Sequence, residues 1–355
     1  MMQSRAATRP DAKRSRRVAL VRPGSEAVTI DGRATRLVRE VCGLAGRRQL
    51  IAEVRRNLGR AGVLEAVRAH DTAALFDWMS RGMAYQGISD YVADAYMQEH
   101  GTVTWHEIQQ SLTSPPHCHK LTSYWAFHRC GYNKTNCTCN EPQNLADCPL
   151  PLPTLRNGRL NQAAFSLYLF MRDVAGGDFV QWLDITIAKA QSDTGDIDAT
   201  RLALLDRLQY LFGLSNKMLT MILSDLLIGA ARDRPHWLEV GASMIVVDTL
   251  VHNFLHRSGI LRRHGASHLY GPLCYGPNGC ASIIRRIARD IDARAFNSSF
   301  PADFPRFIQH AIWRFCAQQS LDTCNGNRIR DTGRCEISWC PVFADCGRVA
   351  LRARR

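Results

Sequence analysis

Three sets of residues in this 355-residue chain have side chains that could do chemistry. Lys217 ends the segment Gly213-Leu-Ser-Asn-Lys217, and its amine could act as a nucleophile. Asp248 follows an apolar run and could take up or release a proton. The third set is four cysteines within 23 residues near the C-terminus, whose thiolates could hold a metal ion or cluster: Cys324, Cys335, Cys340 and Cys346.

The sequence around Lys217 predicts two helices joined by a short turn. An apolar stripe at helical spacing stops at Gly213, and a second helix opens near Lys217; the stripe comprises Leu202, Leu205, Leu208 and Phe212. Such a helix-hairpin-helix can point backbone N–H groups and the dipole of its second helix at a phosphate. The same pattern fits a plain helical hairpin. Lys217 is therefore interpreted either as a nucleophile or as a phosphate-contacting cation.

Asp248 lies between the apolar run 244–247 and a helix expected to begin near Thr249. Its carboxylate could cap that helix. It could also face a cleft opposite Lys217. The two interpretations are compatible, because a cap beside an amine would be held rigidly and kept ionised, as an acid–base partner requires.

Thirteen cysteines without a secretory signal favour a reduced compartment and metal ligation over a disulfide framework. The four C-terminal cysteines fit an iron–sulfur cubane, with Pro341 after the third ligand, and tetrahedral zinc is the alternative. Either would hold a basic loop near phosphates, whose arginines are Arg328, Arg330, Arg334 and Arg348.

A second cysteine-rich block spans about residues 115–153. The preferred ligands for a possible zinc ion there are Cys130, Cys137, Cys139 and Cys148, with Cys118, His117, His119 and His128 beside them. Aromatic and basic residues in the block could stack on a base, and a purely structural zinc loop is the alternative. Cys274 and Cys280 are interpreted as a turn with two unrelated thiols.

Composition and periodicity predict an all-α protein. Hydrophobic residues make up 46% of the chain, enough for a large core, and the net charge of +13 suits an anionic partner such as nucleic acid. No apolar run is long enough to span a membrane, and we expect no membrane association. Helical periodicity covers residues 51–64, 73–97, 163–171, 201–212, 218–230, 249–261, 282–295 and 307–318.

The chain divides into four parts. Residues 1–30 form a basic tail, expected to be disordered, that is either a phosphate-contacting arm or a solvated leader. Residues 31–70 are helices expected to pack with the C-terminal lobe. Residues 71–260 form the hairpin-containing domain with the cysteine-rich insertion, and residues 261–355 hold the last helices and the cysteine loop. Both ends of the chain are thus expected to build one lobe of a two-lobed protein.

These motifs resemble the helix-hairpin-helix DNA glycosylases, particularly the iron–sulfur branch typified by endonuclease III. Gly213 to Lys217 is similar to that family's Gly-x-Gly-x-Lys hairpin, with Ser215 in place of the second glycine. Val247-Asp248-Thr249, with Arg257 nine residues after the aspartate, resembles its Val-Asp-Thr-His helix start, with Leu250 where histidine is common. The resemblance covers residues 70–110 and 200–346. The 31 residues from Lys217 to Asp248 exceed the family's separation and suggest an insertion around 229–244.

The resemblance implies a two-lobed fold and a base-excision mechanism. Lys217 would attack the sugar carbon of a flipped-out nucleotide and form an imine, with Asp248 assisting. Gln86 would fill the vacated space in double-stranded DNA, a [4Fe–4S] cluster would occupy the C-terminal site, and further DNA contacts would come from Gly213, Ser215, Asn216 and Arg257. We expect a monomer in the cytoplasm, associated with the nucleoid. The alternatives are a monofunctional glycosylase that activates water through Asp248, and a non-catalytic metal-dependent DNA-binding or adaptor protein.

Overall fold

A computed structural model describes residues 32–113, 118–151, 158 and 160–352 of the chain. These residues form helices, short helical turns and loops, and their one β-type pairing is the isolated bridge between Asn133 and Thr138. The all-α prediction is confirmed. The tail at 1–30 and His117 lie outside the described residues.

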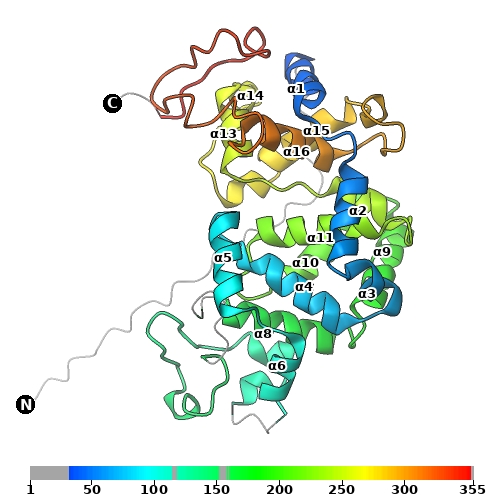
Figure 1. The fold of residues 1–355 in the computed structure, drawn as a ribbon, viewed down its shortest axis with the longest axis vertical. Coiled ribbons are helices and arrows are strands. Elements are labelled where there is room, and N and C mark those ends of the chain that lie inside the picture. The colour runs from blue at the N-terminus through cyan, green and yellow to red at the C-terminus, as the bar shows by residue number, and fades with distance from the viewer. Residues whose placement is uncertain (1–31, 114–117, 152–157, 159, 353–355) are drawn as a thin grey trace, which may run out of the picture.

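The described helices pack around two hydrophobic cores, which give the two lobes seen in Figure 1. The first lobe contains α3 (Val63–Ala69), α4 (Thr72–Ala84), α6 (Trp105–Ser111), α7 (Tyr124–Phe127), α8 (Asn161–Leu169), α9 (Phe179–Thr194), α10 (Ile197–Leu208), α11 (Asn216–Ala230) and α12 (Trp237–Ser243). The second contains α1 (Gly32–Ala45), α13 (Thr249–Arg257), α14 (Ile260–Arg263), α15 (Cys280–Arg289) and α16 (Pro305–Cys316). Helix α5 (Asp90–His100) lies at the level where the lobes meet (Figure 1).

The chain crosses between the cores twice. It leaves the second core within α2 (Leu50–Arg60), where Leu50 belongs to that core and Leu58 to the first, and it returns between Met244 and Ile245. The core boundaries therefore fall at these two places rather than at the predicted residues 70 and 260. Helix α1 and the residues after 245 build the second core together.

Helix α11, which carries Lys217, runs along the boundary between the lobes. Its side chains from Leu219 to Leu227 belong to the first core, whereas Ile228 belongs to the second. Gly229 permits close packing on α2, because a Cβ there would lie 2.4 Å from Leu58 Cδ1. Since α11 is largely buried from Met218 onward, its first turn, with Asn216 exposed and Lys217 half-buried, is held in place by this packing.

The residues that precede Asp248 include the short helix α12, in the region where we predicted an insertion. Trp237 begins this helix and is fully buried. Ser224 of α11 donates a hydrogen bond to the Gly241 carbonyl at 3.0 Å, so α12 packs back on α11. The segment returns the chain to the lobe boundary before α13 starts.

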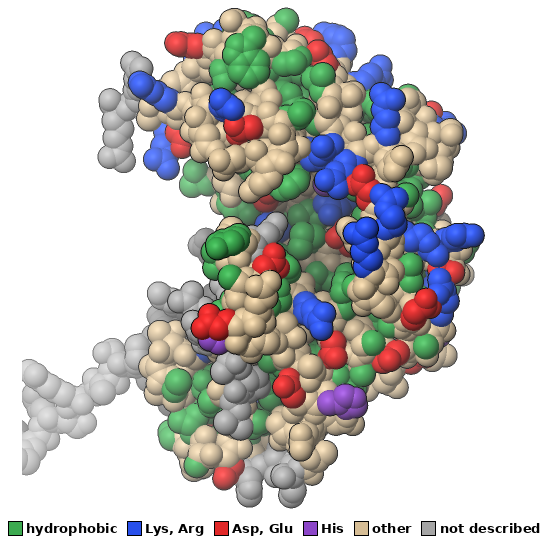
Figure 2. Space-filling view, in the orientation of Figure 1, with side chains coloured by type: hydrophobic (Ala, Val, Ile, Leu, Met, Phe, Trp, Pro, Cys, Tyr) green, Lys and Arg blue, Asp and Glu red, His purple; other side chains and the backbone are tan. Residues whose placement is uncertain are grey.

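The surface between the lobes has two features. Figure 2 shows a hollow between the lobes and Lys and Arg side chains gathered at the same level.

In the part of the chain that the structure describes, no helix has the length and apolar character needed to cross a membrane.

Candidate active site and metal centres

The predicted hairpin is formed between α10 and α11. Gly213 has a φ of +63°, a left-handed conformation that glycine adopts without strain. Ser215 caps α11, and its hydroxyl accepts a hydrogen bond from the Met218 N–H at 3.3 Å. Asn216 and Lys217 are the first two residues of the helix, with Asn216 exposed and Lys217 half-buried. Ser215 is therefore the N-cap of α11.

Gln86 holds this turn from a distant part of the sequence. Its amide Nε2 donates to the Gly213 carbonyl at 2.6 Å, and its Oε1 accepts from the Ser215 N–H at 2.9 Å. The side chain follows α4, so it ties that helix to the hairpin. Insertion of Gln86 into DNA stays a prediction, and it would require both hydrogen bonds to break.

Asp248 caps α13, as the sequence predicted. Its Oδ1 accepts from the Val251 N–H at 2.9 Å. Burial raises the pKa of the carboxyl group, while the Val251 N–H and the charge of Lys217 act in the opposite direction. Burial has the larger effect, so the pKa of Asp248 lies above its ordinary value despite the nearby amine.

Lys217 and Asp248 come from different lobes and lie near enough to interact through charge. The Lys217 ammonium has no hydrogen-bond or ion-pair partner within 4.0 Å among the described residues, so the interaction is not a closed salt bridge. The charge of Asp248 also adds to the burial that raises the pKa of Tyr270. The pair could therefore accept a reacting group between them.

Arg257 differs from its predicted role. It is 1% exposed, and its Nη2 donates to Asp331 Oδ1 at 2.6 Å, with longer contacts to the Ile329 carbonyl. This burial argues against the predicted contact with DNA. Arg257 instead anchors the C-terminal loop, whose backbone also pairs with the end of α13 through Val349 N–H and the Arg257 carbonyl at 2.7 Å.

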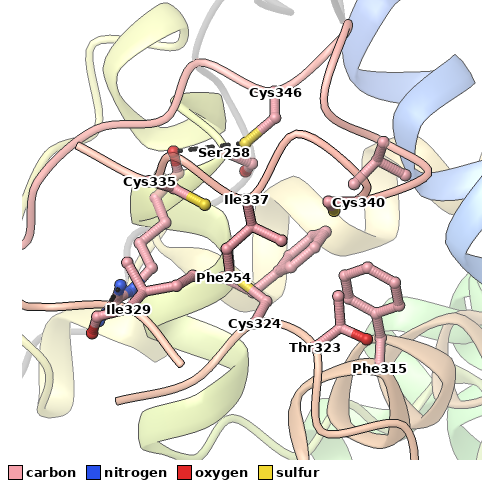
Figure 3. Close-up of a pocket in the computed structure, with 12 residues that line it drawn as sticks. Phe254, Ser258, Phe315, Thr323, Cys324, Ile329, Cys335, Ile337, Cys340 and Cys346 are labelled. Carbon is pink, nitrogen blue, oxygen red and sulfur yellow. Dashed lines mark hydrogen bonds between the residues drawn. The ribbon is translucent and has the colours of Figure 1, made fainter. Parts of the chain in front are cut away.

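The four C-terminal cysteines line one cavity, shown in Figure 3. Phe254, Phe315, Ile337 and Val342 supply its apolar walls, and its empty volume, including the open mouth, is about 360 Å³. The buried Arg257 borders it as well. A hydrogen bond from Cys316 and the charge of Arg257 lower the pKa of Cys324. The charge of Arg257 therefore favours a thiolate at Cys324, whereas burial raises the pKa of Cys340 and Cys346.

The spacing of these sulfurs bears on what the cavity could hold. Four thiolates on one zinc ion would lie roughly 3.8 Å apart, given Zn–S bonds of about 2.3 Å and tetrahedral angles. Among the described residues, the C-terminal cysteines do not form a group of three or more ligand atoms within 4.8 Å of one another. They surround a space instead, as a polynuclear cluster with one thiolate on each iron would need.

The cysteine-rich block places its thiols differently from our preferred set. Cys130, Cys139 and Cys148 lie close enough to influence each other's charge, and Cys118 joins them. Cys137 is exposed, and its sulfur faces the Tyr132 hydroxyl at 3.9 Å. The structure therefore favours Cys118 over Cys137 as the fourth thiol of this group.

Sequence reasoning missed a third group, which could hold a metal ion. It consists of His252, His268, Cys274 and Cys280, whose ligand atoms all lie within 4.8 Å of one another. Both cysteines and His252 are buried. These ligands are separated in the sequence by 15, 5 and 5 residues. This spacing matches no common zinc motif, which is why sequence reasoning did not identify the group.

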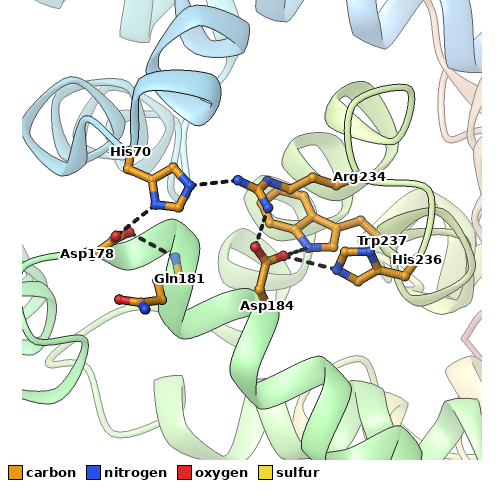
Figure 4. A network of polar contacts seen from close by, with 7 residues as sticks. All are labelled: His70, Asp178, Gln181, Asp184, Arg234, His236 and Trp237. Atoms are coloured by element: carbon orange, nitrogen blue, oxygen red, sulfur yellow. Dashed lines mark hydrogen bonds and ion pairs between the residues drawn. The ribbon is translucent and has the colours of Figure 1, made fainter.

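A network of charged and polar side chains in the first lobe connects three helices and has a structural role (Figure 4). Arg234 donates to His70 Nε2 at 2.8 Å, so the ring's Nδ1 carries the proton donated to Asp178 at 2.7 Å. Asp184 accepts from Arg234 and from Trp237 Nε1, the latter at 2.7 Å. The network joins the end of α3, helix α9 and the start of α12, and it includes no nucleophile.

Comparison of the chain with protein-family models, with curated proteins and with solved structures gave no match. The functional argument therefore rests on the hairpin, on the Lys217–Asp248 pair and on the thiol groups.

Proposed function

We propose that this protein is a DNA base-excision enzyme that cleaves the N-glycosidic bond of a damaged or modified base and then cleaves the strand through an imine on Lys217. The observation that carries the proposal is the placement of Lys217 and Asp248. They belong to different lobes, each occupies the start of a helix, and the charge of the lysine acts on the aspartate. A nucleotide rotated out of the duplex could enter between them.

The chemistry uses the two side chains in sequence. The uncharged amine of Lys217 attacks the sugar carbon C1′, and the bond from C1′ to the base breaks with its electron pair going to the base. Asp248 takes the proton that the attacking nitrogen loses. A carboxyl with a raised pKa suits this step, because it accepts the proton more readily and can return it later. Ring opening then leaves the imine from which the strand is eliminated.

The remaining features support a DNA partner. The turn fixed by Gln86 presents the N-terminus of α11, where backbone N–H groups favour a phosphate. The net charge of +13 would attract nucleic acid. We further propose that the C-terminal cysteines hold a [4Fe–4S] cluster, because their sulfurs surround a cavity instead of converging on a single ion.

Borohydride trapping tests the imine without knowledge of the lesion. The substrate is a duplex with one abasic site, and the proteins are the wild type, Lys217→Gln and a matched control, Lys189→Gln. Lys189 is an exposed lysine on α9 that pairs with Asp193 at 3.1 Å. We expect a covalent adduct with the wild type and the control but none with Lys217→Gln.

The other outcomes separate the alternative functions. Base release that survives in Lys217→Gln would identify a monofunctional enzyme that activates water through Asp248. DNA binding without an adduct or base release in the folded wild type would identify a non-catalytic binder. Either result would reject Lys217 as the nucleophile.

A further inference from the structure

We propose that His252, His268, Cys274 and Cys280 bind one structural zinc ion. This ion would fix the loop of residues 265–280 against the start of α13, where Asp248 lies. The distances fit such an ion. His252 Nδ1 lies 3.4 Å from Cys280 Sγ and 3.5 Å from Cys274 Sγ, and Cys280 Sγ lies 3.5 Å from His268 Nε2. A nitrogen and a sulfur on tetrahedral zinc are separated by roughly 3.6 Å, given bonds of about 2.0–2.3 Å.

The chemistry of the four ligands points to zinc with a structural role. Two imidazoles and two thiolates are a common zinc ligand set, and a redox-active cluster would need a wider arrangement. The four protein ligands leave no coordination position open for a substrate or for water. Two thiols and an imidazole buried together at 0–4% exposure also lose their hydration, which a bound cation would compensate.

The backbone of the loop is shaped to bring the ligands together. Gly276 N–H donates to the Leu273 carbonyl at 3.1 Å, and Gly279 N–H donates to the Gly276 carbonyl at 2.9 Å. A Cβ on Gly279 would lie 2.1 Å from the Leu273 carbonyl oxygen, so only glycine permits this approach. The tight turn places Cys274 beside Cys280, which begins α15.

The loop also contacts Val247, the residue before Asp248, directly. The Tyr275 hydroxyl accepts from the Val247 N–H at 3.0 Å and donates to the Val247 carbonyl at 3.3 Å. The Tyr270 ring lies 5.8 Å from the His252 ring, and the Asp248 charge reaches Tyr270. His252 follows Asp248 by one helical turn. Metal binding would therefore fix the position of α13 relative to the loop. Its importance for catalysis rests on the proposed function of Asp248.

The metal site can be tested by elemental analysis of the full-length protein, independently of any activity. Zinc and iron are measured per chain in the wild type, in His268→Ala and in His268→Cys. We expect His268→Ala to lose one equivalent of zinc and no iron, and His268→Cys to keep it, because three thiolates and one imidazole also bind zinc. His268 is half-buried, which favours folding of both variants.

Three further measurements complete the test. Cys274→Ser should lose the same equivalent, whereas the buried lone thiol variant Cys42→Ser should keep it. Cobalt substituted for zinc should give tetrahedral d–d bands with thiolate charge transfer, and His268→Ala should lose the part due to this site. Full zinc in folded His268→Ala would overturn the proposal. A thiol count lower by two in unreduced wild type would overturn it in favour of a disulfide between Cys274 and Cys280.

Discussion

Replacing Asp248 by asparagine should separate helix capping from chemistry. The carboxylate accepts the Val251 N–H at 2.9 Å, and an asparagine side chain oxygen can accept the same bond. Asparagine and aspartate rank alike at the N-cap, so Asp248→Asn should change the free energy of unfolding by less than about 0.5 kcal/mol, while Asp248→Ala should lose about 1 kcal/mol. Asparagine removes a negative charge from the helix N-terminus, which lowers stability. It also removes the cost of burying a carboxylate, so the two effects on stability partly cancel.

The effect on activity should be much larger than the effect on stability. Loss of a positioned proton acceptor lowers the rate by about 100- to 10,000-fold. The assay is single-turnover strand cleavage on a duplex with one abasic site, with enzyme in excess, beside urea denaturation of the same preparations. Strand cleavage by Asp248→Asn within threefold of the wild-type rate would refute the catalytic role. Equal destabilisation by asparagine and alanine would refute the capping argument.

Three further predictions concern other parts of the molecule. Gln86→Ala should destabilise the protein by about 1 kcal/mol in urea denaturation and weaken binding to abasic DNA, because two hydrogen bonds to the hairpin are lost; Gln86→Glu, whose carboxylate would face the Gly213 carbonyl, should bind no better than the alanine variant. Burial, with the charges of Arg306, Arg47 and Arg314, lowers the pKa of His310 to about 3, so protonation favours the unfolded chain and stability falls as pH drops below the unfolded pKa of about 6.5. Between pH 7 and pH 5 the wild type should therefore lose about 2 kcal/mol that His310→Gln does not lose, and parallel curves for the two proteins would contradict this. Anaerobically purified protein should contain iron and absorb visible light, and Cys340→Ser should lose both while Cys42→Ser keeps them; a colourless wild type with zinc in this site would favour the zinc alternative.

The helical fold was predictable because periodic apolar residues settle helix identity locally. The helices expected to open near Lys217 and near Thr249 begin at Asn216 and Thr249. The helix before the hairpin ends at Leu208, however, so Phe212 lies in the turn and not on the helical stripe predicted to reach Gly213. The lobe boundary within α2 was not predictable, since Leu50 and Leu58 lie on one continuous amphipathic helix and differ only in what packs against them. Periodicity identifies a buried face but not the core that buries it.

Side-chain partners that come from distant segments escaped the sequence for a similar reason. Gln86 bonds to backbone atoms of the hairpin more than 120 residues away, and backbone acceptors leave no mark on residue type. Arg257 was expected to contact DNA on the strength of the resemblance alone, and its burial could not be foreseen because exposed and buried arginines are identical in sequence. The ligand group around His252 was missed because two of its members sit on helices whose approach depends on the Gly279 turn.

The short helix α13 connects all the features of the second lobe that bear on function. Its N-cap is Asp248, its middle carries His252, and its last residue, Arg257, borders the C-terminal thiol cavity. The C-terminal loop closes on its end through the Val349 N–H bond to the Arg257 carbonyl. A helix of nine residues is too short to be stable alone, so its position depends on what packs along it. Metals bound at the two proposed thiol-containing sites of this lobe would therefore affect the position of Asp248 through α13, whereas Lys217 is held separately by the first lobe. The alignment of the proposed catalytic pair thus depends on how α13 is fixed at both ends.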